Sequence, residues 1–145
     1  MGKAENEAKK EFLWSYRDSV RRLERISAEI EEIRAMRMGA SAGTGGTGRR
    51  GWKNDLSAYA AQLDSLERKK KKELCSTRRA LVQIEEAIND LKDELEKDIL
   101  FYHYIKGKEW WEIAVEVHFS ESWIYAVHGR ALAHLKIPQE CSSLE

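Results

Sequence analysis

The sequence has one proline, two cysteines and no apolar run long enough to cross a membrane. The proline, Pro138, lies near the end of the chain, so no proline interrupts a helix before it. Cys75 and Cys141 are too few for a disulfide framework and lack the spacing of metal ligands, which favours a cytoplasmic protein. The charged N-terminus shows no signal segment, so neither a secreted nor a membrane-bound protein is expected.

An excess of charge is also missing from the whole chain, because 25 basic residues balance 25 acidic ones. The two signs are spread unevenly, however. Residues 1–97 carry 21 basic and 18 acidic side chains, a net charge of +3, whereas residues 98–145 carry 4 and 7, a net charge of −3. Nonspecific DNA affinity comes mainly from neutralised phosphates. The acidic second part is therefore not expected to bind DNA strongly by itself.

Apolar residues recur at intervals of three and four in the first third of the chain, as one face of a helix requires. They are Leu13, Tyr16, Val20, Leu23, Ile26, Ile30 and Ile33. The spacing predicts an amphipathic helix that begins near Glu5 or Glu11 and ends near Met36. Residues 39–51 contain six glycines, which make a continued helix costly and predict a flexible loop.

A second series of apolar residues at helical spacing follows: Leu56, Tyr59, Leu63, Leu66, Leu74, Leu81, Ile84, Ile88, Leu91 and Leu95. With Asp55 as N-cap it predicts one helix of 42 residues, about 63 Å long, ending at Glu96. The shorter first helix can cover only its early part, which predicts an antiparallel helical hairpin, a coiled coil, over residues 1–97. Residues 81–95 then need a further apolar partner, either a second protomer or the C-terminal part of the chain. We expect a homo-oligomer.

Cations cluster at a few places in this first part. The clusters are Arg49, Arg50 and Lys53 after the glycine-rich loop, then Lys69–Lys72, and then Arg78 and Arg79. A solvated helix surface is the simplest interpretation of such runs. The alternatives are contacts with DNA phosphates, for which Arg49, Arg50 and Lys53 are candidates, or with an acidic partner.

Residues 98–138 have the pattern of two short helices that bury a shared core across a tight turn. The core positions are Ile113, Ala114, Val117, Phe119, Ile124, Val127, Leu132 and Leu135. His118 stands at the turn, Ser120 is suited to cap the second helix, and a supporting helix that ends at Gly107 precedes them. The pattern predicts an all-α protein with a C-terminal helix-turn-helix domain and a tail at residues 139–145. An ordinary three-helix bundle without a DNA role is the alternative.

The segment "ILFYHYIKGKEWWEIAVEVHFSESWIYAVHGRALAHLK", residues 99–136, resembles region four of bacterial sigma factors, the helix-turn-helix that binds the −35 promoter element. It is more closely similar to small prophage proteins, loosely grouped with phage transcriptional regulators of the ArpU and RinA type. These join a helical N-terminal hairpin, often interrupted by a Gly/Ser/Thr-rich loop, to a sigma-like C-terminal domain. The resemblance implies the same fold here and a DNA-binding role.

Carried over residue by residue, the resemblance implies that one side of the second helix faces the major groove. The residues implied are Ser120, Glu121, Ser122, Tyr125, Ala126 and Gly129, with Arg130 near the DNA backbone. The chain departs from the sigma pattern where Ser122, Tyr125 and Ala126 replace long polar residues suited to bidentate base contacts. Such a helix is expected to have weaker sequence discrimination.

Three tryptophans in this segment call for separate interpretations. Trp110 shares a helical face with Ala114 and Val117 and is expected in the core. Trp111 and Trp123 are expected to be partly exposed and to contact a protein partner, because aromatic residues dominate interface hot spots.

Catalytic, metal and cofactor sites are not expected. The four histidines lack the spacing that places two ligands on one helical face, and no nucleophile is paired with a base. The sequence thus favours a non-enzymatic, DNA-binding transcriptional regulator of phage type, with the hairpin used for dimerisation or for contact with RNA polymerase. The alternative is a coiled-coil protein-interaction module that binds RNA polymerase or another phage protein and contacts DNA little.

Overall fold

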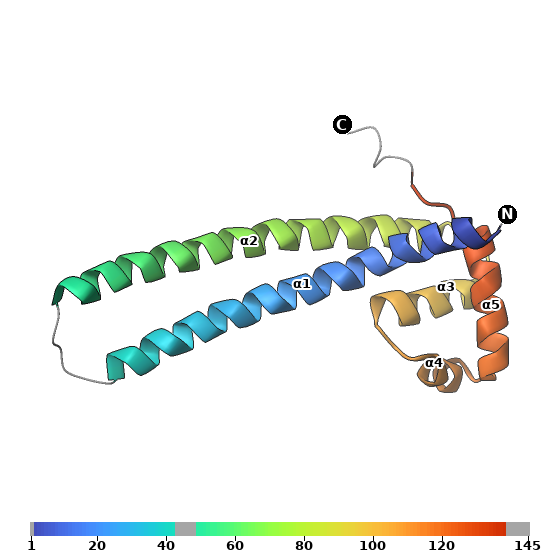
Figure 1. Cartoon of the computed structure of the whole chain (residues 1–145). Coiled ribbons are helices and arrows are strands. Elements are labelled where there is room, and N and C mark those ends of the chain that lie inside the picture. Colours follow the sequence, from blue (N-terminus) through green and yellow to red (C-terminus); the bar gives the residue numbers. More distant parts are fainter. Residues whose placement is uncertain (1, 43–48, 139–145) are drawn as a thin grey trace. The chain divides into compact units, whose positions relative to one another are not determined.

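The computed structural model describes residues 2–42 and 49–138, with side chains for residues 2–37 and 56–138. All elements in these ranges are helical: α1 (Gly2–Ala42), α2 (Arg49–Asn89), α3 (Glu94–Leu100), the π-helical turn η1 (Phe101–Ile105), α4 (Trp110–Val117) and α5 (Glu121–His134) (Figure 1). The predicted all-α class is therefore confirmed for the described part of the chain, and the predicted tail at 139–145 lies outside it. Within that part, no helix has both the length and the apolar character needed to cross a membrane.

The helices form two compact units. One, the two-helix unit, is Ser19–Ser76, and the other, the C-terminal unit, combines Met1–Asp18 with Thr77–Glu145. The predicted boundary between residues 97 and 98 falls inside α3. The C-terminal unit also takes in the first turns of α1 and the last turns of α2, which a domain of residues 98–138 would have left out.

In the two-helix unit, α1 and α2 run antiparallel (Figure 1). The Ser19 hydroxyl donates to Glu73 Oε1 at 3.0 Å, and Arg34 Nη2 lies 3.0 Å from Glu67 Oε1, so α2 runs backward as α1 advances. The buried core between them consists of Ile26, Ile30 and Leu66, with Ile33 and Leu63 packed against it. These residues all belong to the two apolar stripes of the sequence.

The C-terminal unit has a larger core that draws on five elements. Its buried members are Leu13, Ile84, Ala87, Ile88, Leu91, Leu100, Tyr104, Ile105, Ala131, Leu132 and Leu135. The apolar partner that residues 81–95 require is thus the start of α1 together with the C-terminal helices of the same chain. A second protomer is therefore not needed to cover residues 81–95.

The first helix is longer at both ends than predicted. α1 and α2 each contain 41 residues, so α1 is not the shorter of the two. Residues 2–11 are mostly Ala, Lys and Glu, which are strong helix formers although they lack an apolar stripe. At the other end the helix continues through Gly39, and α2 already begins at Arg49, so helices occupy part of the expected loop at 39–51.

The second helix is not continuous to Glu96, as the apolar spacing suggested. α2 ends at Asn89, and a short non-helical connection precedes α3. Asp93 has an extended backbone (φ −90°, ψ 122°), and its side chain accepts a hydrogen bond from the Leu95 backbone N–H at 3.1 Å. Asp caps a new helix well because its oxygen satisfies a free N–H of the first turn. The break keeps both Leu91 and Leu95 in the core or against it, which is why periodicity alone did not reveal it.

Candidate functional site

The α4–α5 segment is built around a second, small core in the C-terminal unit. Its buried residues are Ile99, Ile113, Ala114, Ile124 and Val127. Four of the predicted core positions are therefore confirmed here, with Val117 half-buried beside them, and the predicted Leu132 and Leu135 lie in the larger core. Phe119 is the exception, because 47% of it is exposed and it does not pack inward.

The connection between α4 and α5 is made by residues suited to the ends of helices. Glu109 and Glu112 form a capping box at the start of α4, and His118 ends that helix in the left-handed region (φ 62°, ψ 42°). The Ser120 hydroxyl accepts a hydrogen bond from the Trp123 backbone N–H at 3.2 Å and so caps α5. The predicted turn at His118 and cap at Ser120 are both confirmed. α5 then packs against α3 and α4.

The candidate DNA-contacting residues all lie at the N-terminal cap or on the solvent side of α5. Ser120, Glu121, Ser122, Tyr125, Ala126, Gly129 and Arg130 are exposed. The opposite side of the helix carries the buried Ile124, Val127 and Ala131. A Cβ added at Gly129 would meet nothing within 4 Å, so this surface is open at that point. A partner can approach the backbone of α5 closely there.

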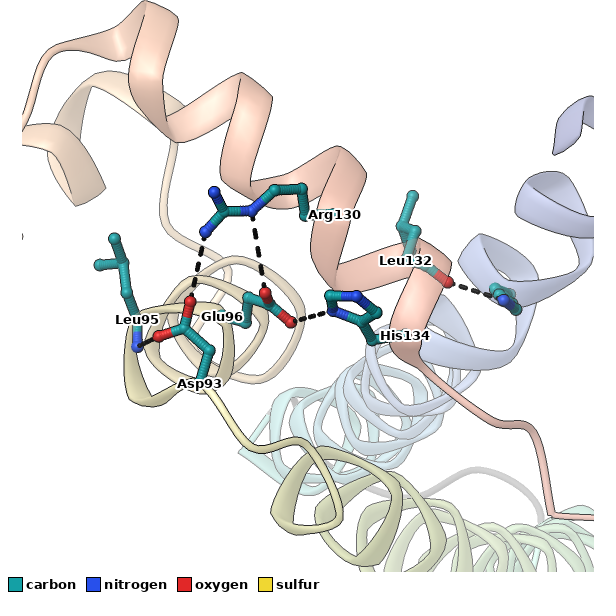
Figure 2. Close-up of polar contacts among 7 residues, drawn as sticks. Asp93, Leu95, Glu96, Arg130, Leu132 and His134 are labelled. Carbon is teal, nitrogen blue, oxygen red and sulfur yellow. Dashed lines mark hydrogen bonds and ion pairs between the residues drawn. The ribbon is translucent and has the colours of Figure 1, made fainter.

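Arg130 is engaged by carboxylates of the same unit, as Figure 2 shows. Its Nη2 lies 3.3 Å from Asp93 Oδ2, and its Nε lies 3.9 Å from Glu96 Oε2. The guanidinium carbon also lies 5.4 Å from the centre of the Trp123 ring, within range of a cation–π contact. The one cation of α5 is thus largely neutralised where it stands. The resemblance to sigma factors implied instead a position near the DNA backbone.

Glu96 is the centre of this cluster and was missed by the sequence analysis. Only 3% of its side chain is exposed, and its other oxygen accepts a hydrogen bond from His134 Nδ1 at 2.9 Å. A buried carboxylate needs such partners because an unpaired buried charge is very unfavourable. The helical spacing could have predicted its burial, because Glu96 precedes Ile99 and Leu100 by three and four residues and therefore lies on the same face of the helix.

The far end of α5 is held by α1. Lys9 Nζ donates to the Leu132 carbonyl oxygen at 2.7 Å, and Lys9 is almost fully buried. The last four carbonyl groups of a helix lack partners within it and carry the negative end of its dipole. A buried ammonium group at this point therefore stabilises α5 and fixes it to the start of α1.

Aromatic residues fill the space behind α5. Trp110, which was expected in the core, is half-buried and packs against it, and it stacks on His103 with ring centres 3.8 Å apart. His103 Nδ1 donates to the Lys108 carbonyl oxygen at 2.9 Å, and burial lowers the pKa of His103, partly offset by that hydrogen bond. His103 thus has a packing role.

The most buried polar contact of this cluster joins Tyr104 to His128. The Tyr104 hydroxyl donates to His128 Nε2 at 2.7 Å. Burial, aided by the charges of His103 and Lys10, lowers the pKa of His128 from its ordinary 6.5 to about 4. Burial also raises the pKa of Tyr104. Both groups are therefore neutral at physiological pH, and a neutral imidazole nitrogen can accept the hydrogen bond from the Tyr104 hydroxyl.

Large apolar side chains are exposed around the α4–α5 connection. Trp111 and Val115 are one turn apart on α4 and are 60% and 68% exposed, and Phe119 and Trp123 are nearly half exposed. The expected exposure of Trp111 and Trp123 is confirmed. The side chains of Arg49, Arg50 and Lys53 lie outside the described ones. Among the described residues, no group of three or more His, Cys, Asp or Glu side chains could hold a metal ion.

No family model, curated protein or solved structure matches the chain significantly.

Proposed function

We propose that the chain is a DNA-binding transcriptional regulator whose α4, connection and α5 act as a helix-turn-helix. The observation that carries this proposal is the exposed side of α5. A capped helix follows a left-handed turn, is held from behind by α3 and α4, and presents all the candidate contact residues to solvent. An α-helix held in this way can enter the major groove of duplex DNA.

The chemistry of α5 favours base contacts over phosphate contacts. Ser122 can donate to or accept from a base edge, and Tyr125 and Ala126 can contact a thymine methyl group. Arg130 is already paired with Asp93 and Glu96, so it adds little to phosphate attraction. We therefore expect modest affinity with a sequence preference set by few contacts.

A selection from random duplex DNA at 50 mM and 150 mM NaCl tests this function. Ser122→Arg is run beside the wild-type chain, and Ser57→Arg, an exposed serine of α2, is the matched control with the same added charge. An enriched sequence that changes with Ser122→Arg but not with Ser57→Arg supports the proposal. Enrichment of the same sequence by all three proteins would show that α5 does not contact the bases.

The exposed apolar residues favour a second function, a protein-interaction module that binds RNA polymerase or another partner. Trp111, Val115, Phe119 and Trp123 are the large apolar type that dominates protein interfaces. An apolar interface changes little with salt, whereas phosphate contacts weaken steeply. Binding of RNA polymerase core enzyme at 100 mM and 500 mM NaCl, with Trp111→Ser as the variant, separates the two functions. Salt-resistant binding that Trp111→Ser abolishes would favour the interaction module.

Neither function involves catalysis, and we propose a non-enzymatic protein. Both functions fit the fold equally well, because each needs only a rigid α5 and its surroundings. They differ in which surface is used, the open side of α5 or the apolar residues near the connection.

A further inference from the structure

The strongest concentration of positive charge lies in the two-helix unit, distant from α5 in the sequence. We define the basic band as residues 19–26 of α1 and 66–73 of α2. These stretches lie side by side, because Arg22 Nε is 2.6 Å from Glu73 Oε1 and the Ser19 hydroxyl donates to the same oxygen. The band contains eight cations, namely Arg21, Arg22, Arg25 and the run Arg68–Lys72, and three carboxylates, a net charge of +5. The whole chain is neutral.

The cations of the band are largely open to solvent. Lys69, Lys71 and Lys72 are exposed, and Arg68 is 80% exposed although it pairs with Asp64 one turn earlier. The effect of the positive charges on their surroundings is visible at Glu73. Its pKa is lowered, first by the hydrogen bond from Arg22 and further by the charges of Arg22 and Arg25, against the opposing effect of burial.

The run at 68–72 looked like a solvated helix surface in the sequence, and the structure adds the arginines of α1 beside it. Within one helix, five consecutive cations point in several directions, so no ligand meets them all. Arg22 and Arg25 lie on the side of α1 that faces Glu73, and Lys69 is one turn from Glu73 on α2. The band therefore joins cations of two helices into one surface, which was not visible in either stretch alone.

We propose that the basic band binds the phosphate backbone of duplex DNA and supplies the nonspecific affinity that α5 lacks. The proposal deepens the function proposed above and takes the identity of its ligand from it. Phosphate groups are recognised by Lys and Arg without regard to base sequence, and such contacts provide most of the nonspecific affinity of DNA-binding proteins. The contacts of α5 with the bases would then determine which DNA sequence is bound.

The surroundings of the band favour a phosphate backbone over other anionic partners. None of the large exposed hydrophobic side chains of the described residues lies in residues 19–26 or 66–73. A membrane surface helix needs an apolar side to insert between lipids, and a protein interface needs apolar or aromatic anchors. Proteins that bind single strands stack bases on aromatic side chains, and the band contains none. Binding to the phosphate backbone of a duplex needs cations and no apolar or aromatic side chains.

The test measures binding of a 30-base-pair duplex of arbitrary sequence by fluorescence anisotropy from 50 to 300 mM NaCl. Lys69→Gln/Lys71→Gln/Lys72→Gln removes three exposed charges and keeps good helix formers. The control, Lys3→Gln/Lys92→Gln/Lys136→Gln, makes the same change of charge at exposed positions outside the band. Circular dichroism confirms that both variants keep their helices.

The plot of log K against log salt has a negative slope, and each lost phosphate contact makes it shallower by about 0.9. If two or three lysines contact phosphates, the slope falls by about 2 to 3 and affinity at 50 mM NaCl falls by about 10²- to 10³-fold. The control is expected to lose less than about threefold. Equal losses in the two variants would show a general charge effect and overturn the proposal.

Failure of this proposal can be told apart from failure of the proposed function. If the band variant binds DNA as the wild type does, and Ser122→Arg still changes the selected sequence, the function stands and the band has no part in it. If the wild type binds polyglutamate and the band variant does not, while both bind DNA equally, an acidic protein is the ligand of the band. If the wild-type chain binds no duplex DNA even at 50 mM NaCl, both proposals are wrong.

Discussion

The buried His128 gives the C-terminal unit a pH dependence that can be calculated from the structure. Burial, together with the charges of His103 and Lys10, lowers the pKa of His128, so its imidazole is held neutral, and the ring lies 2.7 Å from the Tyr104 hydroxyl in a hydrogen bond. Its pKa is about 4 in the folded chain and about 6.5 when exposed. Between these two values the unfolded chain binds one proton more than the folded chain does. Stability must therefore fall as the pH falls through this window.

The magnitude follows from the difference of about 2.5 pKa units, at 1.36 kcal/mol per unit. The full loss of unfolding free energy is about 3 kcal/mol, reached below pH 4, and about 2 kcal/mol of it is already lost between pH 7 and pH 5. A typical domain is stable by only 5–15 kcal/mol. The loss by pH 5 is therefore large enough to move the urea midpoint measurably.

The assay is urea unfolding followed by circular dichroism at pH 7 and pH 5, for the wild type and His128→Gln. Glutamine keeps an oxygen that can accept from Tyr104, favours a helix and does not titrate. We expect the wild type to lose about 2 kcal/mol more than the variant between the two pH values, because carboxylates and His103 titrate in both proteins. Equal losses would refute the assignment of a buried neutral imidazole at His128.

Three further substitutions test other parts of the C-terminal unit. Gly107 has a φ of +72°, so Gly107→Ala should lower the unfolding free energy by about 1–2 kcal/mol in urea titrations, with the helical content unchanged. Lys9→Met removes the buried donor to the last turn of α5 and should lower thermal stability by about 1.5–3 kcal/mol, whereas Lys9→Arg should lower it less. Asp93→Asn/Glu96→Gln removes the two carboxylates that pair with Arg130. On the proposed function, duplex affinity should rise about tenfold at low salt, and the slope of log K against log salt should become steeper by about 0.9. Adding Arg130→Gln should abolish this gain.

Much of the fold could be predicted because burial follows helical spacing. Ile26, Ile30 and Leu66 were placed correctly as core residues by their intervals of three and four. The ends of α4 and α5 were also predictable, because Ser120 has the side chain that an N-cap needs and His118 tolerates a left-handed backbone. These are local properties, and local sequence determines them.

Other features of the fold were not visible in the apolar spacing or the residue types. Lys9 is an ordinary helix former by sequence, and its burial depends on the Leu132 carbonyl group 123 residues away. The end of α2 at Asn89 could not be seen from spacing, since the break preserves the burial of Leu91. Phe119 fitted an inward position by type, yet the left-handed turn at His118 leaves it near solvent.

The break before α3 has a consequence for α5 that neither helix shows alone. Asp93 uses its two oxygens for different purposes: Oδ1 accepts from the Leu95 N–H and starts α3, and Oδ2 lies 3.3 Å from Arg130. The residue that starts one helix thus holds the only cation of another. Because Arg130 is also 49% exposed, a phosphate approaching α5 competes with Asp93 and Glu96 for a guanidinium that it can reach. If α5 binds DNA as proposed, its affinity should change when Asp93 and Glu96 are replaced, without a change in the bases that it prefers.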